Sequence, residues 1–326
     1  PMDRNRLAPK QGQDGFDVEA RVKPGGDRSA EVFIVMRSEG LFKVLDFQGE
    51  EEFAVPGLAI QAAEGPGRGA GHDVPVHVPN LPAAWEGLTI AHLTDLHRSR
   101  YVSAAYLCEC VARANALSPD VMVFTGDYLS HTRGPRRRYV YGDDAEAERF
   151  AHEAAECLGR ARARYGVFAS LGNHDHWYDA GKITRLIEAA GVPVLRNQSV
   201  AVPIRGEPLP IIGLGDLWNE PPDCPRAFAG VDAPLSLVLM HNPDPFEHWS
   251  QPGSHLILAG HTHGGQVNIP FYGPPIVPSS YGRKYARGLF QRGAVQMYVN
   301  AGLGCIFPPV RFNCRPEIAL LHLHRA

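Results

Sequence analysis

Five short apolar runs that each open into a polar loop constrain the fold most strongly. In open α/β sheets, the carboxyl ends of the strands form the edge at which ligands bind, so side chains that follow such runs are expected to converge. A single His-x-His pair is weak evidence for a metal site, but five ends that carry His, Asp or Asn are hard to attribute to turns. These ends are Asp95-Leu96-His97, Gly126-Asp127, Gly172-Asn173-His174-Asp175, His241-Asn242 and Gly260-His261-Thr262-His263.

Helical patterns separate the first of these runs. Residues 103–117 have helical spacing and begin with Ser103, a residue type that favours a helix start. Residues 143–166 are expected to form a long helix with acids first and arginines last, and residues 180–191 a helix that ends in glycine. Beyond them, most segments are strand-like, including residues 192–197, 199–204 and 209–216 as consecutive strands. The order predicts an α/β protein with a mixed sheet or two sheets.

Composition and charge fit a soluble globular chain with a separate beginning. The 326 residues are 44 % hydrophobic and 21 % charged, and the formal net charge of -3 gives no global field for nucleic acid. Residues 1–75 are expected to be an N-terminal extension of unassigned function with a Gly-rich linker, and residues 76–326 the catalytic domain. No apolar run reaches the ~20 residues that span a bilayer, and no export signal is recognisable.

The cysteines give a weak indication of the compartment. None of the six stands in a C-x-x-C pair, and Cys108 and Cys110 lie in a helix-like segment facing different ways. We expect reduced packing residues and therefore a cytoplasmic protein, with peripheral membrane contact as the alternative.

The ligand types indicate the metal and the chemistry. Imidazole and carboxylate groups without thiolate suit Mn, Fe, Zn or Ni. Two metals about 3.5–4 Å apart form a clamp for in-line displacement at phosphorus. Such a pair needs a bridging ligand, and the short carboxylate of Asp127 is the natural candidate.

The motifs "DLH", "GD", "GNHD", a lone His and "GHTH", in this order, resemble the calcineurin-like metallophosphoesterases over roughly residues 78–323. Longer stretches such as "GHTHGGQVNIPFYGPPIVPSSYGRKYARGLF" look like the bacterial subgroup of membrane-associated phosphodiesterases and UDP-2,3-diacylglucosamine hydrolases. The resemblance implies a two-sheet β-sandwich flanked by helices, in four layers α/β/β/α.

The resemblance also implies roles for individual residues. Two divalent transition-metal ions (Mn, Fe or Zn) would be bound, with His174 facing the phosphate as general acid or charge stabiliser and Asp175 orienting it. One metal would take Asp95, His97, Asp127 and His263, and the other would take Asp127, Asn173, His241 and His261.

The implied activity is hydrolysis of phosphodiester or pyrophosphate bonds by attack of a metal-bridging hydroxide. One alternative is a lipid-linked pyrophosphate hydrolase of the UDP-2,3-diacylglucosamine type, and another is a metal-bound scaffold without catalysis. The expected substrate is a small-molecule or lipid-linked phosphate ester, and no nucleic-acid partner is expected.

Some positions depart from related patterns. Ser130 stands where serine/threonine protein phosphatases carry an acid, and Arg133 is two places late, which argues against that class. His255 replaces the usual Asp before the "GHTH" strand, so a change in the surroundings of the ligands is expected there. The basic run at 133–140 is interpreted as a solvated loop, or alternatively as a contact for anionic groups. The aromatic pairs at 177–178 and 271–272 are assigned either to packing or to a substrate groove.

Overall fold

The computed structural model describes residues 10–11, 17–24, 30–38, 41–49, 72–79, 81–130, 144–307 and 309–326. The first four ranges form an antiparallel sheet in the order β1-β2-β3-β4. Its strands are β1 (Lys10–Gln11), β2 (Asp17–Pro24), β3 (Ala30–Ser38) and β4 (Leu41–Gly49). The apolar runs of the N-terminal extension thus lie on β3 and β4, while its role as a separate domain stays a prediction.

A five-stranded mixed sheet forms one half of the remaining fold, in the order β5-β15-β6-β7-β8. Its strands β6, β7 and β8 are parallel, so their carboxyl ends lie at one edge. The predicted boundary between residues 75 and 76 falls inside β5, which pairs with β15. The strands are β5 (His72–Val78), β6 (Thr89–Leu93), β7 (Val121–Phe124), β8 (Val167–Ala169) and β15 (Ala319–Arg325).

A six-stranded sheet forms the other half, in the order β13-β14-β12-β11-β10-β9. Strands β10, β11, β12 and β14 are parallel, and β9 and β13 close the edges as antiparallel partners. The strands are β9 (Gln198–Ile204), β10 (Glu207–Gly213), β11 (Ser236–Leu239), β12 (His255–Ala259), β13 (Gly288–Arg292) and β14 (Val295–Val299).

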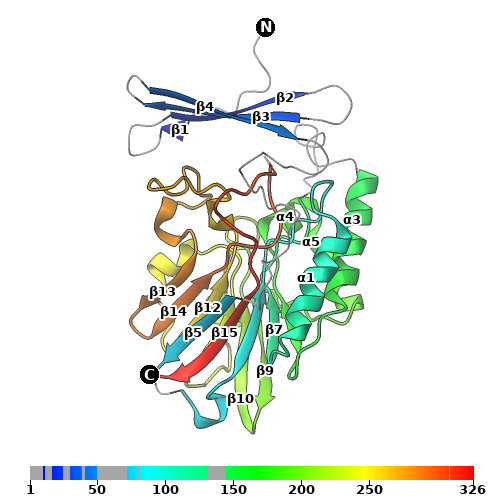
Figure 1. Ribbon diagram of the computed structural model, residues 1–326. Coiled ribbons are helices and arrows are strands. Elements are labelled where there is room, and N and C mark those ends of the chain that lie inside the picture. Colours follow the sequence, from blue (N-terminus) through cyan, green and yellow to red (C-terminus); the bar gives the residue numbers. More distant parts are fainter. Residues whose placement is uncertain are drawn as a thin grey trace.

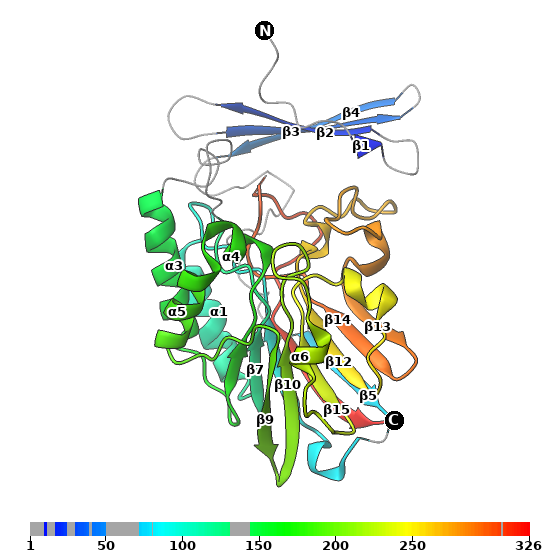
Figure 2. The same ribbon diagram turned by 180° about the vertical axis from the view of Figure 1, so that it is seen from behind.

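The alternation of side chains along β12 explains the layering. Leu256 and Leu258 pack into the core between the two sheets, whereas Ile257 and Ala259 pack into a second core on the outer face. A strand buried on both faces reads as a continuous apolar run, as this one does. Two sheets face to face, each with an outer cover, give the predicted four layers, so the fold class is confirmed (Figures 1 and 2).

Three helices cover the outer face of the five-stranded sheet, side by side in both views (Figures 1 and 2). They are α1 (Ala104–Ala116), α3 (Asp144–Leu158) and α5 (Ala180–Ala189). The Ser103 side chain accepts a hydrogen bond from Tyr106 N and caps α1, as its position predicts. The outer cover of the six-stranded sheet is instead built from short elements: α6 (Cys224–Ala227), η2 (Asp244–His248) and η4 (Gly282–Tyr285).

Two expectations about local structure are wrong. Helix α3 ends at Leu158 rather than at residue 166, and Arg162 donates hydrogen bonds to Gly159 O and Ala161 O in the turn beyond it. A Cβ at Gly159 would lie 3.0 Å from Ala190 O, so this glycine lets the end of α3 approach α5 closely. Residues 192–197 form no named strand and make only an isolated bridge, between Ala169 and Val194.

The cysteine expectation is wrong for one pair. Cys108 on α1 and Cys157 on α3 form a disulfide, whereas Cys110, Cys224, Cys305 and Cys314 are free. Structural disulfides persist mainly in oxidising compartments, so this bond counts against the cytoplasmic expectation, which rested partly on reduced cysteines. Within the described ranges, no helix combines the length and the apolar character needed to cross a bilayer.

Candidate metal centre

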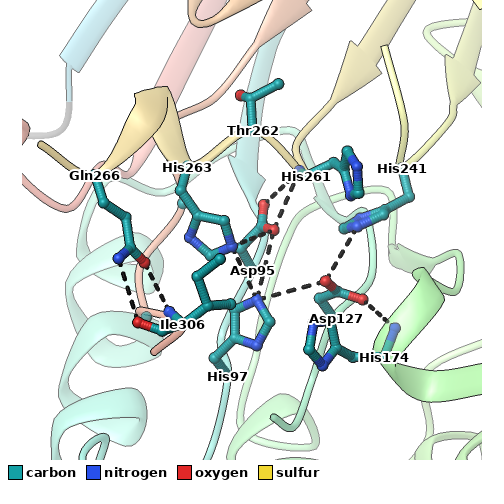
Figure 3. Close-up of polar contacts among 12 residues, drawn as sticks. Asp95, His97, Asp127, His174, His241, His261, Thr262, His263, Gln266 and Ile306 are labelled. Atoms are coloured by element: carbon teal, nitrogen blue, oxygen red, sulfur yellow. Dashed lines mark hydrogen bonds and ion pairs between the residues drawn. The ribbon is translucent and has the colours of Figure 1, made fainter. Parts of the chain in front are cut away.

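The five polar strand ends converge between the two sheets. The ends of β6, β7 and β8 come from the five-stranded sheet, and those of β11 and β12 come from the six-stranded sheet. Figure 3 shows their Asp and His side chains pointing toward one another. The predicted site residues all lie in this cluster, and all are buried: Asp95, His97, Asp127, Asn173, His174, Asp175, His241, His261 and His263.

Left-handed backbone marks five of the predicted ligands. Asp95, His97, Asp127, His261 and His263 have φ between 47° and 70°. A non-glycine residue with positive φ is uncommon, and such residues cluster at functional sites because the surrounding structure must hold them there. The conformation turns the chain sharply after each strand and directs the side chain into the space between the sheets.

One group of donors lies around Asp95. Its Oδ1 is 3.3 Å from His263 Nε2 and 3.8 Å from His97 Nε2, and the two Nε2 atoms are 3.0 Å apart. These three residues, here called the Asp95 cluster, converge within the span that one cation could bridge. Both carboxylate oxygens of Asp95 also accept from His261 N, at 3.1 and 2.9 Å, which fixes the carboxylate.

A second group lies on the other side of Asp127. Its members Asp127, His241 and His261, here called the His241 cluster, again converge. Asp127 Oδ2 lies 3.4 Å from His97 Nε2 and 3.2 Å from His241 Nε2, so one oxygen faces both clusters (Figure 3). Asp127 Oδ1 accepts from His174 N at 2.8 Å. A shared, rigidly held carboxylate is the geometry that a bridging ligand requires.

A cation would satisfy the buried nitrogen and oxygen atoms of these side chains better than hydrogen bonds among them do. The atoms His261 Nε2 and Asn173 Oδ1 are buried and have no hydrogen-bond partner in the described part of the chain, and His241 Nε2 has none apart from its ion-pair contact with Asp127. A buried polar atom without a partner is costly, and a metal ion is one way to satisfy it. These are the ligands that the resemblance assigns, with Asp127, to one of the two metals.

The electrostatics of the cluster lead to the same conclusion. Burial disfavours a charged His241, yet the carboxylates of Asp127 and Asp95 raise the pKa of His241 to about 10. Burial and the charge on His241 lower the pKa of His261 to about 4. Two buried carboxylates thus require positive charge nearby, and divalent cations would supply it while every imidazole stays neutral.

Hydrogen bonds at the far nitrogens orient two of the rings. His241 Nδ1 lies 2.7 Å from Thr125 O, which only a protonated Nδ1 can satisfy, so in the neutral ring Nε2 carries the lone pair that a cation would take. His97 Nδ1 lies 2.8 Å from Ser130 Oγ. Ser130 therefore supports a candidate ligand, a role that the sequence comparison with protein phosphatases did not suggest.

His174 and Asp175 begin helix α4 (Asn173–Tyr178). Burial and the neighbouring charge on His97 lower the pKa of His174 to about 3, so the ring is neutral at pH 7. The orientation of His174 by Asp175 stays a prediction. The Asp175 carboxylate accepts from the backbone N–H groups of Asp127 and Gly172 at 2.8 Å and of Tyr128 at 2.9 Å. Asp175 thus holds the loop that carries Asp127.

Two residues that the sequence analysis passed over support the centre. Arg311 is buried, and its Nη2 lies 3.4 Å from His263 Nδ1 and donates to Ala301 O at 2.8 Å. Gln266 pairs with both backbone groups of Ile306 and so fixes the turn η3 (His263–Gly265) (Figure 3). Gln266 follows the "GHTH" motif by three residues and Arg311 lies far along the chain from any of the five polar strand ends, so neither was identified as a supporting residue.

The remaining candidates lie elsewhere. His255 is at the amino end of β12, whereas His261 follows the carboxyl end of that strand. The Nε2 atom of His255 forms a hydrogen bond with Pro252 O, so the expected effect near the ligands is wrong. Tyr178 is buried in the helix-side core. Phe271 is fully exposed. Arg133 and the basic run at 133–140 lie outside the described residues.

Comparison with known proteins agrees with this arrangement. The chain matches the calcineurin-like phosphoesterase family over residues 88–265. It is 32 % identical to the metallophosphoesterase YkuE of Bacillus subtilis over 246 residues, which are 74 % of this chain and 81 % of the relative. It is also 32 % identical to the phosphodiesterase YaeI of Escherichia coli over 243 residues, 72 % of this chain and 81 % of the relative.

A more distant relative is the UDP-2,3-diacylglucosamine pyrophosphatase LpxG of Chlamydia muridarum. It is 27 % identical over 286 residues, which are 75 % of this chain and 86 % of that protein. The predicted family and subgroup are confirmed by these matches. The chain belongs to the calcineurin-like phosphoesterase family and is a phosphoester hydrolase.

Proposed function

We propose that the protein is a dinuclear metal-dependent hydrolase of phosphodiester or pyrophosphate bonds. The observation that carries this proposal is the Asp127 carboxylate, whose Oδ2 faces donors of both clusters, at 3.4 Å from His97 Nε2 and 3.2 Å from His241 Nε2. One divalent cation would be held by Asp95, His97, Asp127 and His263. The other would be held by Asp127, Asn173, His241 and His261.

The two cations, when bound, supply charge neutralisation at phosphorus and a hydroxide nucleophile at neutral pH. The chain's own residues supply geometry. Asp95 is fixed by His261 N, and Asp127 by His174 N and by the Asp175 carboxylate on its own backbone N–H. Positioning of this kind lowers the barrier because the reacting groups need no reorganisation.

His174 would interact directly with the substrate. It is 8 % exposed, and its ring packs edge to face against the His97 ring, with centroids 4.8 Å apart. A neutral imidazole can donate a hydrogen bond to a phosphoryl or leaving oxygen, and an anion bound there would favour the protonated ring.

Hydrolysis of a lipid-linked pyrophosphate is the second candidate. It is favoured by the relative named UDP-2,3-diacylglucosamine pyrophosphatase and by the exposed apolar loop next to the metal centre. A Cβ at Gly265, two residues after His263, would lie 2.2 Å from Pro274 Cβ, so this loop packs closely against the turn that follows His263. Phe271 and Ile276 on the loop are exposed. Peripheral membrane contact would follow from the same surface.

Metal content and turnover test the proposal together. Protein reconstituted with Mn, Fe or Zn and then dialysed should hold close to two ions per chain and hydrolyse bis(p-nitrophenyl) phosphate. His241→Ala should lower the metal content and abolish turnover, whereas His152→Ala, an exposed histidine of α3, should change neither. Two bound metals without turnover of any diester or pyrophosphate in a substrate panel would favour the scaffold alternative. A content below one ion would refute the dinuclear site.

A further inference from the structure

Trp218 lies beside a candidate metal ligand, on the loop between β10 and α6. Its ring meets the His261 ring edge to face, with centroids 4.7 Å apart and planes at 79°. The side chain is 51 % exposed, whereas Trp85 is buried and Trp177 and Trp249 are partly buried. A lone exposed indole needs no explanation, but one that touches a metal-centre histidine offers apolar surface where a substrate would bind.

Trp177 extends this surface to the other side of the centre. Its plane lies within 10° of the Trp218 plane, with ring centroids 6.2 Å apart. Trp177 also packs on His174, with ring centroids 4.6 Å apart. The two indoles therefore form a continuous wall, here called the tryptophan wall, that runs from His174 to His261. Nearly parallel rings at this spacing leave faces on which a further flat ring can stack.

The loop that carries Trp218 is held by a buried carboxylate. Asp216 is 1 % exposed, and its Oδ2 accepts from Trp218 N at 3.1 Å and from Asn219 N at 2.9 Å. Gly215 N donates to Asn197 Oδ1 at 2.8 Å, and a Cβ at Gly215 would lie 2.0 Å from Glu220 O. The position of the indole is thus built into the backbone and does not depend on a loose loop.

We propose that the tryptophan wall is a binding subsite for a flat aromatic ring carried by the phosphoryl group of the substrate, as in an aryl or nucleoside phosphoester. This inference rests on the proposed function, because it places the phosphoryl group at the metal centre. A flat ring gains stacking energy on an indole face, whereas a saturated ring of similar size gains only burial. Stacking of a base on an aromatic side chain corresponds to a gain in affinity of about ten-fold.

Non-hydrolysable phosphonates test the subsite without turnover. Phenylphosphonate, cyclohexylphosphonate and methylphosphonate would be titrated calorimetrically into manganese-reconstituted protein. Wild type should bind the phenyl compound about ten-fold more tightly than the methyl compound. The affinity for the cyclohexyl compound should be well below the affinity for the phenyl compound. Trp218→Ala should remove this preference, and Trp218→Phe should keep most of it. The Kd for methylphosphonate should change less than about two-fold in either variant.

A matched variant separates the wall from other exposed aromatics. Phe271→Ala removes a fully exposed ring from the loop after η3 and should leave the preference for phenyl unchanged. The 5′-phosphonate of thymidine identifies the source of the ring: a loss of affinity in Trp218→Ala that is several-fold larger for this ligand than for phenylphosphonate indicates a nucleobase, and an equal loss for both indicates any flat ring.

Several results would overturn the subsite. These are an unchanged phenyl-to-methyl ratio in Trp218→Ala, equal affinity for cyclohexyl and phenyl in wild type, or loss of the preference in Phe271→Ala. The ratios come from binding, so they stay measurable if no diester is turned over. An absence of diester turnover would count against the proposed function and not against the subsite.

Discussion

Gly172→Ala should damage the centre without removing any ligand. Gly172 precedes α4 with φ -108° and ψ 178°, an extended conformation that alanine adopts freely, so the backbone itself imposes no penalty. The added Cβ would, however, lie 2.3 Å from Asp127 Oδ1 and 2.7 Å from Asp127 N. An ordinary contact needs about 1 Å more, so the Asp127 carboxylate, the proposed bridging ligand, has to move.

The size of the effect follows from that displacement. Overpacking of a tight interior site costs about 1–3 kcal/mol, and for a chain of this size each 1 kcal/mol lowers Tm by about 2–4 °C. A misplacement of 1 Å in a catalytic group costs about 100-fold in rate. We therefore expect a modest loss of stability, a metal content below two per chain after dialysis and a roughly 100-fold loss of diester turnover.

Gly181→Ala is the matched control. Gly181 lies in helix α5, and its added Cβ would lie 3.3 Å from the flexible end of Arg185 and at an ordinary contact distance of 3.6 Å from Asp179 Oδ1. Alanine is the better helix former by about 1 kcal/mol, so Tm should hold or rise while metal content and turnover stay unchanged. Elemental analysis, steady-state kinetics and a thermal melt on both variants decide the case. If Gly172→Ala kept two metals and turnover within two-fold of wild type, the assignment of Asp127 as the bridging ligand would be wrong.

Three further predictions concern other parts of the chain. His174→Ala should keep both metals and lower diester turnover about 10²–10⁴-fold, with smaller losses for good leaving groups; equal losses across leaving groups would contradict proton donation. The unreduced, denatured protein should show four free thiols, and reduction of the Cys108–Cys157 bond, which spans 49 residues, should lower stability by at most about 4 kcal/mol; six thiols before reduction would disprove the bond. Burial favours a neutral Glu317, but hydrogen bonds from His72, from the Tyr298 hydroxyl and from a backbone N–H lower the pKa of Glu317 below 4.5. Its contribution to stability is therefore present above pH 4.5 and lost as pH falls through the lowered pKa; Glu317→Gln should flatten this acid limb in denaturant melts, and an unchanged limb would refute the assignment.

The convergence of the candidate ligands was predictable because its signal is local. Each candidate ligand lies within a few residues of the end of an apolar strand, and parallel strands deliver their carboxyl ends to one edge, so order along the chain becomes proximity in space. The same reasoning failed for Cys108 and Cys157, because their pairing depends on how α1 packs on α3 and not on spacing. The reasoning also missed Trp218, because its loop follows β10 of the six-stranded sheet but carries no histidine.

The backbone of the ligand loops explains why these residue types mark the site so well. Asp95, Asp127 and His261 have left-handed φ of 49°, 57° and 70°. Among residues other than glycine, Asn, Asp and His adopt that conformation several-fold more readily than most. A sharp turn after a buried strand therefore favours the same side chains that bind a divalent cation. The sequence could identify the candidate ligands but not the strained backbone, because close approaches such as that of Gly302 to Asp95, where an added Cβ on Gly302 would lie 2.7 Å from Asp95 Cβ, form only when the two sheets come together.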